Sequence, residues 1–216
     1  MNEKIVIAVD AMGGENSPNK IIDGIKLVLK NNSNLYFNLF GKSDQINDLI
    51  IDNYLLKEKC QIINSELVIN DNESPLQAAK KNDKSSMWQA INSVKNKESQ
   101  IALSAGNTGA LLILSKMILE MIEGIDKPAL AGLWPNKKGL NIVLDLGANI
   151  ECSDKNLIDF TYMGSSLYKS LFPKLMPKIA ILNVGSEENK GHDEIKKAYK
   201  FLKEKKINDF EFMGYV

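Results

Sequence analysis

Short apolar runs rich in β-branched residues alternate along the chain with amphipathic stretches of helical length. The apolar runs predict strands at residues 5–9, 35–40, 100–103, 141–146, 178–184 and 209–213. Strands that alternate with helices in this way are typical of a mostly parallel sheet covered by helices. The pattern therefore predicts an α/β fold.

The first predicted helix follows Ser17 and Pro18, which are expected to be its N-cap and first residue. Its buried face is expected to hold Ile21, Ile25 and Val28, which recur at helical spacing. Further helices are predicted from about residue 43, after the glycine loop at 104–109, after a Ser153 cap, and over about 193–205.

No linker, low-complexity tract or internal repeat interrupts this alternation, so a single α/β domain is expected over residues 1–216. The last predicted strand is followed by Gly214, and earlier strands followed by glycine lead into a new helix. The chain is therefore expected to stop in mid-pattern and to lack a C-terminal portion.

The most apolar stretch covers residues 110–122 and is interrupted by Ser115, Lys116 and Glu120. It falls short of the roughly 20 apolar residues that a membrane-spanning helix needs. We expect a buried helix here, while peripheral contact with a membrane stays open.

The charges of the chain balance, with 27 acidic and 27 basic residues among 216. Together with a hydrophobic content of 44%, this balance argues against disorder and against a nucleic-acid-coating role. Every basic residue is lysine, so a bound phosphate would depend on backbone N–H groups, hydroxyls, amides and lysine ammoniums.

Cys60 and Cys152 are the only cysteines, which is too few for a disulfide framework or a structural zinc site. The N-terminal sequence has no cleavage site of the signal-peptide type. A reducing cytoplasm is the expected location, and no metal is expected.

Four loops rich in glycine and small polar residues follow predicted strands, and ligands of open parallel sheets bind beyond the carboxyl ends of strands. These loops lie at residues 10–14, 104–109, 145–149 and 183–185. The candidate phosphate or substrate ligands in them are Asp10, Gly13, Gly14, Ser104, Gly106, Asn107, Thr108, Gly109, Asp145, Asn149 and Gly185.

The loop at 104–109 is the strongest phosphate candidate, because glycines permit close backbone approach and the next helix would point its N–H groups at an anion. For any one loop, a tight turn between strand and helix is an equal alternative. Neither GxxxxGK[ST] nor GxGxxG occurs, which argues against a nucleotide-dependent enzyme such as an oxidoreductase.

Several motifs in register resemble the PlsX family of bacterial phosphate acyltransferases. They are DAMGG at 10–14, SSM at 85–87, SAGNTGAL at 104–111, GIDKPAL at 124–130, LDLGAN at 144–149, MGS at 163–165, and LNVG at 182–185 followed by Lys190 and Gly191. The resemblance implies transfer of a fatty acyl group from acyl carrier protein to inorganic phosphate, which gives acyl phosphate for phospholipid synthesis. It also implies a three-layer α/β/α fold like that of isocitrate dehydrogenase and phosphotransacetylase.

Further expectations follow from the resemblance. Family members act without a cofactor or nucleic acid, are dimers and work beside the membrane, so a homodimer with peripheral membrane association is expected. They usually carry Asp where this chain has Glu15, and they continue beyond Val216 with a segment implicated in the active site. A non-catalytic remnant that binds phosphate or acyl carrier protein is therefore the alternative to an active enzyme.

Lys190 matches the family position for which an acid–base role is proposed. Asp10 and Asp145 each close a strand, where a carboxylate can orient a lysine, bond loop N–H groups or merely stabilise a turn. Cys152 is expected to be structural, and His192 matches no residue that the motif requires.

One face of the last helix carries Lys196, Lys200 and Lys203 at helical spacing. Such a face is usually only solvated. Because acyl carrier proteins are acidic, the hypothesis is that these lysines attract the acyl donor.

Overall fold

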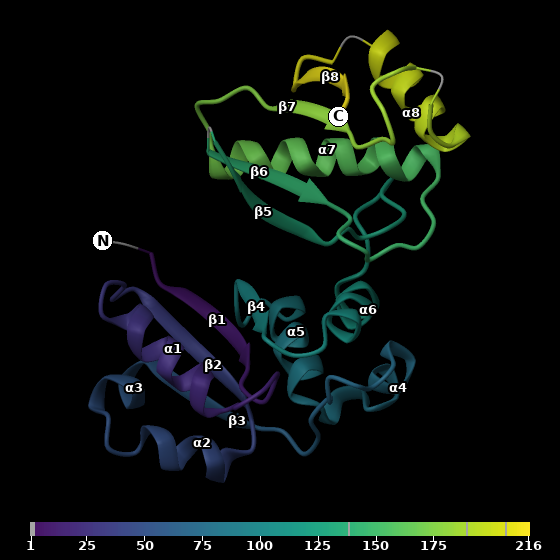
Figure 1. The fold of residues 1–216 in the computed structure, drawn as a ribbon. Coiled ribbons are helices and arrows are strands. Elements are labelled where there is room, and N and C mark those ends of the chain that lie inside the picture. Colours follow the sequence, from purple (N-terminus) through teal and green to yellow (C-terminus); the bar gives the residue numbers. More distant parts are fainter. Residues whose placement is uncertain (1–2, 138, 189, 206) are drawn as a thin grey trace. The chain divides into compact units, whose positions relative to one another are not determined.

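The computed structural model describes residues 3–137, 139–188, 190–205 and 207–216. The chain divides into two compact units, residues 1–120 and 121–216, which we describe in turn (Figure 1). The expectation of a single domain over the whole chain stays a prediction.

Unit 1 contains a parallel sheet of four strands in the order β3-β2-β1-β4. The strands are β1 (Ile5–Asp10), β2 (Leu35–Gly41), β3 (Cys60–Asn64) and β4 (Ile101–Ser104). Asp10 pairs with Phe40 on one side and with Ser104 on the other, so the carboxyl ends of three strands meet at one edge of the sheet. The predicted parallel sheet is confirmed.

Helices cover both faces of this sheet (Figure 1). On one face α1 (Asn19–Leu29), α2 (Ser43–Ile50) and α3 (Tyr54–Lys59) form a core with alternate residues of β1 and β2, such as Val9 and Leu39. On the other face α5 (Ser86–Lys95) covers Ala8 and Phe40. A second core joins α5 to α4 (Pro75–Lys80) and α6 (Thr108–Leu119), and a short 3₁₀ helix, η1 (Asn82–Lys84), precedes α5.

The start and the buried face of α1 differ from the prediction. Pro18 occupies the N-cap position without a side-chain cap, and the hydroxyl of Ser17 donates to the carbonyl of Gly13 at 2.6 Å instead. The buried residues of α1 are Ile22, Ile25 and Leu29. Val28, which was predicted to be buried, is 42% exposed.

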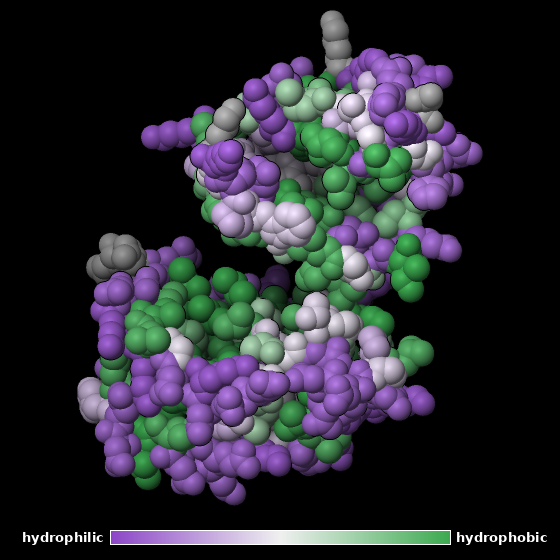
Figure 2. Space-filling model, viewed as in Figure 1, coloured by the Kyte–Doolittle hydropathy of each residue, from purple (hydrophilic) through white to green (hydrophobic). Residues whose placement is uncertain are grey.

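The apolar stretch after Gly109 forms α6, which buries only one side of its surface. Ala110, Leu114 and Ile118 pack into the second core, whereas Met117 is 58% exposed and the predicted burial is wrong for it. Figure 2 shows that apolar side chains also lie on the surface of both units. Over the described ranges, no helix has the length and apolar character needed to cross a bilayer.

The described residues of unit 2 form two pairs of strands and two helices, which are labelled in Figure 1. β5 (Ala131–Asn136) and β6 (Gly139–Leu144) are antiparallel, while β7 (Lys178–Ile181) and β8 (Glu211–Tyr215) are parallel. The antiparallel pair was not predicted, because only one of its strands was recognised in the sequence. The helices are α7 (Asp154–Leu171) and α8 (Asp193–Glu204), whose apolar faces share a core with β7 and β8.

The predicted cap of α7 is confirmed. The hydroxyl of Ser153 accepts the N–H of Asn156 at 3.2 Å, and the side-chain oxygen of Asn156 accepts the N–H of Ser153 at 3.1 Å. This reciprocal capping box satisfies two of the N–H groups that a helix start leaves without partners.

Candidate functional site

The carboxylate of Asp10 lies buried at the carboxyl end of β1, with 2% of the residue exposed. Its Oδ1 accepts the Ser86 hydroxyl at 2.6 Å and the Met12 N–H at 3.3 Å, and its Oδ2 accepts the Ser104 hydroxyl at 2.7 Å. These bonds join β1 to β4 and to the start of α5. Both carboxylate oxygens point at protein donors, so Asp10 fixes hydroxyls at this edge of the sheet.

Burial raises the pKa of the Asp10 carboxyl, because the charged form loses its hydration. The hydroxyls of Ser86 and Ser104 and the N–H groups of Met12 and Gly13 act in the opposite direction, since they stabilise the carboxylate. Burial prevails, so the folded protein holds this proton to a higher pH than the unfolded chain does.

We predict a pH-dependent effect of Asp10→Asn on stability. A raised folded-state pKa stabilises the native state fully below the unfolded pKa of about 3.9, and this contribution disappears as pH rises through the folded pKa. Asn has no such titration. The unfolding free energy of the wild type minus that of Asp10→Asn should therefore fall as pH rises from 4 to 8 in urea titrations. A difference that increased with pH would contradict the raised pKa.

Two glycine loops meet backbone to backbone beside Asp10. A Cβ on Gly13 would lie 2.8 Å from the Gly106 nitrogen and 2.7 Å from Asp10 Oδ2. A Cβ on Gly14, whose φ is +79°, would collide with the carbonyl oxygen of Ala105. Only glycine fits this approach, and the predicted ligands Gly13, Gly14, Ser104 and Gly106 are therefore brought together by the fold.

Lys20 also lies at this loop and was missed in the sequence. Its Nζ lies 2.9 Å from the position that a Gly14 Cβ would occupy. The residue is exposed in the first turn of α1. Nothing in the spacing of lysines along the chain distinguishes it, because only the folded path of the Gly13–Gly14 loop brings it there.

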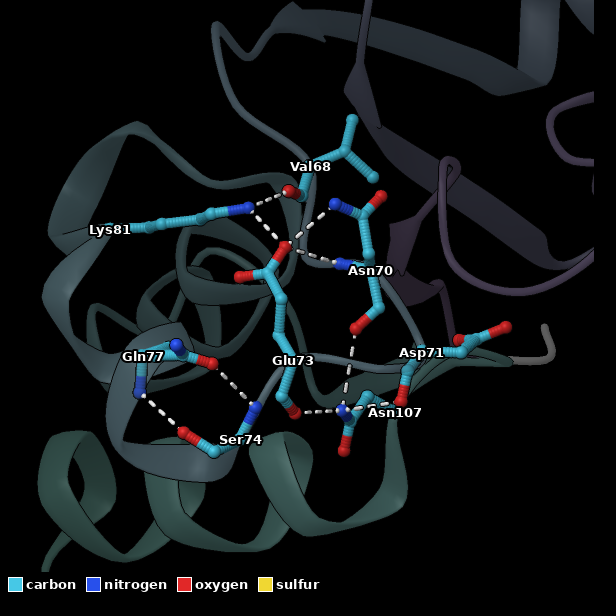
Figure 3. A network of polar contacts seen from close by, with 8 residues as sticks. All are labelled: Val68, Asn70, Asp71, Glu73, Ser74, Gln77, Lys81 and Asn107. Carbon is cyan, nitrogen blue, oxygen red and sulfur yellow. Dashed lines mark hydrogen bonds and ion pairs between the residues drawn. The ribbon is translucent and has the colours of Figure 1, made fainter.

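Asn107 uses both ends of its amide at the start of α6, and Figure 3 shows the bonds that its Nδ2 makes. Its Oδ1 accepts the N–H of Ala110 at 3.0 Å as a helix cap. Its Nδ2 donates to the carbonyl oxygens of Asn70, Asp71 and Glu73 at 3.4, 3.0 and 2.8 Å. The side chain predicted to bind substrate is thus engaged in holding the loop that precedes α4.

The same network continues into α4 (Figure 3). Lys81 forms an ion pair with Glu73, and Ser74 and Gln77 form the capping box of α4. Gly109 packs against this helix, since its Cβ would lie 3.0 Å from Pro75 Cγ. Thr108 is the exposed first residue of α6.

Asp145 is the first residue of the loop that follows β6 in unit 2, and its φ is +63°. Asp145 Oδ1 accepts the N–H of Asn149 at 3.1 Å and its side-chain Nδ2 at 2.9 Å, and Asn149 Nδ2 also bonds the Pro128 carbonyl at 2.9 Å. Asp145 and Asn149 are therefore brought together, in a turn that their own side chains stabilise.

Cys152 belongs to the same loop, and its thiol donates to Asp145 Oδ2 at 3.3 Å. Partial burial raises the pKa of this thiol, and the hydrogen bond and charge of Asp145 raise it further, against a smaller opposing effect of Lys127. A thiol is a poor nucleophile while it stays protonated. The electrostatics thus suit the structural role expected for Cys152.

Lys190 lies in the loop between β7 and α8, with its side chain 52% exposed. Its Nζ pairs with Glu187 Oε1 at 3.1 Å. A Cβ on Gly185 would lie 3.1 Å from Lys190 Cδ, so the lysine stem passes over Gly185. The structure brings Gly185 and Lys190 together, and Glu187 is a further charged group that sequence reasoning missed.

The three lysines along one face of α8 each form an ion pair with a carboxylate of unit 2. Lys196 lies 3.7 Å from Asp193, Lys200 lies 4.0 Å from Glu204, and Lys203 pairs with Glu188. Exposed pairs of this kind are weak and can exchange partners. His192 is the exposed N-cap residue of α8 and makes no side-chain cap bond. Among the described residues, no group of three or more His, Cys, Asp and Glu could hold a metal ion.

Two curated phosphate acyltransferases are similar to this chain over its full length. The one from Pelagibacter ubique is 55% identical over 216 residues, and the one from Neorickettsia sennetsu is 42% identical over 219 residues. The chain spans 64% and 63% of their lengths. These matches confirm the resemblance to the PlsX phosphate acyltransferases.

Solved structures share the fold at low sequence identity. A phosphotransacetylase from Streptococcus pyogenes superposes with a TM-score of 0.68 at 12% identity, covering 100% of this chain and 69% of that one. A branched-chain phosphotransacylase from Enterococcus faecalis gives a TM-score of 0.58 at 17% identity, covering 93% and 65%. The predicted phosphotransacetylase-like fold is confirmed.

Residues 5–216 match the sequence profile of a protein family described as fatty acid synthesis protein. The matched range includes both units and every loop considered above. This chain belongs to the fatty acid synthesis protein family.

Proposed function

We propose that this chain is a phosphate acyltransferase that moves a fatty acyl group from acyl carrier protein to inorganic phosphate. The product would be an acyl phosphate that serves phospholipid synthesis. The observation that carries the proposal is the full-length similarity to proteins named phosphate acyltransferase, at up to 55% identity in the two relatives described. The proposal is made for a chain that spans about two thirds of those relatives.

The phosphate is proposed to bind at the glycine loops of unit 1. Gly13 and Gly14 approach Gly106 closely, and Lys20 supplies a positive charge at the same loop. The first N–H groups of α6, at Thr108 and Gly109, precede the Ala110 N–H that Asn107 caps. Such groups have no partner within the helix and attract anions.

Asp10 is proposed to act through hydroxyls and not on phosphate directly. An ionised carboxylate offers only acceptors, so it would repel a phosphate dianion. By accepting from Ser86 and Ser104 at 2.6 and 2.7 Å, it fixes the two hydroxyl groups at the sheet edge. Asn107 is proposed to serve as a helix cap that keeps α6 in place.

In the proposed reaction a phosphate oxygen attacks the thioester carbonyl, a tetrahedral oxyanion forms, and the carrier-protein thiolate leaves. Bound nucleophiles need no covalent enzyme intermediate, and hydrogen-bond donors at the oxyanion lower the barrier. Lys190 is proposed to donate the proton that the departing thiolate takes up. Asp145, Asn149 and Gly185 are proposed to shape the loops of unit 2 that contact the acyl donor.

The partners of the proposed enzyme are acyl carrier protein, inorganic phosphate and a second copy of the chain. It is proposed to work in the cytoplasm with peripheral membrane association, and without a cofactor or nucleic acid. The paired lysines of α8 are the proposed contact for the acidic carrier protein, because their exposed ion pairs can be exchanged for its carboxylates.

The test is release of free carrier-protein thiol from acyl carrier protein thioester by the purified chain. We expect the rate to rise with phosphate concentration and to saturate. Binding of phosphate or carrier protein by a folded chain, without thiol release, would instead support the alternative of a binding-only protein. A phosphate-independent rate would contradict transfer to phosphate.

A further inference from the structure

The carboxamide of Asn183 ties together the two ends of the loop that carries Lys190. Asn183 Nδ2 donates to the Gly185 carbonyl and to the Lys190 carbonyl, each at 3.1 Å. The backbone N–H of Asn183 donates to the Val216 carbonyl at 3.0 Å, which extends the pairing of β7 with β8. One side chain therefore anchors the loop to the end of a strand pair.

The packing around this amide leaves little freedom. Gly191, which follows Lys190, has a φ of +91°, and a Cβ there would collide with Asn183 Oδ1. That oxygen is buried, and no hydrogen-bond partner for it is found in the described part of the chain. The amide oxygen is thus packed against the backbone of Gly191, while the two N–H donors of the amide face the two carbonyls.

The hydrogen-bond donors of the Asn183 side chain match the two carbonyl oxygens that face it. An asparagine amide has two N–H donors, and two carbonyl oxygens are presented to them. Aspartate would place carboxylate oxygens against carbonyl oxygens, and alanine would leave both carbonyls without this partner. Either change would release the loop from the strand end.

We propose that Asn183 is a positioning residue for Lys190, which rests on the proposed role of Lys190 as a proton donor. Asn183 bonds the Lys190 backbone, and the lysine stem runs over Gly185, whose carbonyl is the other acceptor. The side chain thereby sets where the ammonium stands. Catalysis depends steeply on such placement, and a displacement of about 1 Å can lower a rate about 100-fold.

The kinetic test compares Asn183→Ala, Lys190→Ala and the double variant. We expect Asn183→Ala to lower kcat by about 10-fold to 100-fold while the KM for phosphate changes less than about threefold. The double variant should be no slower than Lys190→Ala, because a residue that acts through Lys190 has no further effect once Lys190 is absent. Losses that multiply in the double variant would overturn the proposal.

A second readout does not need turnover. A protease specific for lysine cuts the Lys190–Gly191 bond, and we expect cutting there to be at least about tenfold faster in Asn183→Ala, since local opening exposes the bond. The midpoint of unfolding in urea should stay within error. Asn32→Ala is the matched control, because Asn32 Nδ2 bonds the Val28 carbonyl at 2.9 Å on an exposed helix end. Unchanged cutting in Asn183→Ala would overturn the proposal.

Asn183→Asp adds a pH test of the hydrogen bonds that hold the loop. A protonated carboxyl regains one donor, so cutting at Lys190 should slow as pH falls through the carboxyl pKa, whereas Asn183→Ala should show no such recovery. The two proposals can fail separately. Full turnover in Lys190→Ala would refute the proposed acid role and the positioning role that rests on it, whereas a protected loop and full turnover in Asn183→Ala would refute only the positioning role.

Discussion

Lys190→Ala is expected to lower the rate of thiol release about 100-fold to 10,000-fold, because a positioned proton donor contributes about that much. The thiolate would then leave without a nearby acid. Phosphate binding should persist, since the proposed phosphate loops lie in unit 1 and Lys190 lies in unit 2. The measurement is steady-state thiol release as a function of phosphate concentration, together with calorimetric binding of inorganic phosphate.

Lys26→Ala is the matched control for this variant. Lys26 pairs with Asp23 at 3.1 Å and three residues away, as Lys190 pairs with Glu187 at 3.1 Å and three residues away. Both pairs are exposed, so both substitutions remove a weak surface ion pair. If the two variants lost activity equally, charge or stability would explain the effect and Lys190 would have no special role.

Gly14→Ala is expected to destabilise the protein by at least about 2 kcal/mol, because it combines overpacking with a backbone conformation that disfavours a side chain. The new Cβ would collide with the Ala105 carbonyl oxygen at a φ of +79°. The loops of β1 and β4 would have to separate. We therefore expect weaker phosphate binding as well as a lower unfolding free energy in urea.

Gly24→Ala is the control in the same unit, and we expect it to raise the unfolding free energy that Gly14→Ala lowers. Gly24 lies inside α1, and a Cβ there meets no atom within 4 Å. Alanine is favoured over glycine in a helix interior by about 1 kcal/mol, so this variant should be more stable and bind phosphate as the wild type does. Gly14→Ala behaving like Gly24→Ala would show that the two loops do not need their close approach.

The alternation of apolar runs predicted three of the four strands of the parallel sheet in unit 1, because each of these runs is short and lies between stretches of helical periodicity. It missed β3 at Cys60–Asn64. The buried face of α1 was not predictable in the same way. Ile21, Ile25 and Val28 form one apolar row, and Ile22, Ile25 and Leu29 form the next row around the helix. Which row is buried depends on the angle at which the helix lies on the sheet, and that angle is a tertiary property.

The ends of strands were also not fully predictable from the sequence. The apolar run at 141–146 continues past β6, yet the strand ends at Leu144 because Asp145 adopts a φ of +63° and bonds Asn149. The second strand of the antiparallel pair, β5, was missed because its run includes Pro135 and Asn136. Proline is uncommon in strands other than edge strands. β5 pairs with β6 in a sheet of two strands, so it is an edge strand and can include Pro135.

The sequence by itself determined which loops follow strands and, through motifs in register, the family of the chain. The contacts within the candidate site were decided only by the tertiary structure. Asp10 meets Ser86 and Ser104 across 76 and 94 residues, and the Gly13–Gly14 loop meets Ala105 and Gly106. Contacts between residues so far apart in the chain leave no periodic trace in the sequence, because they arise only when separate strands align in one sheet.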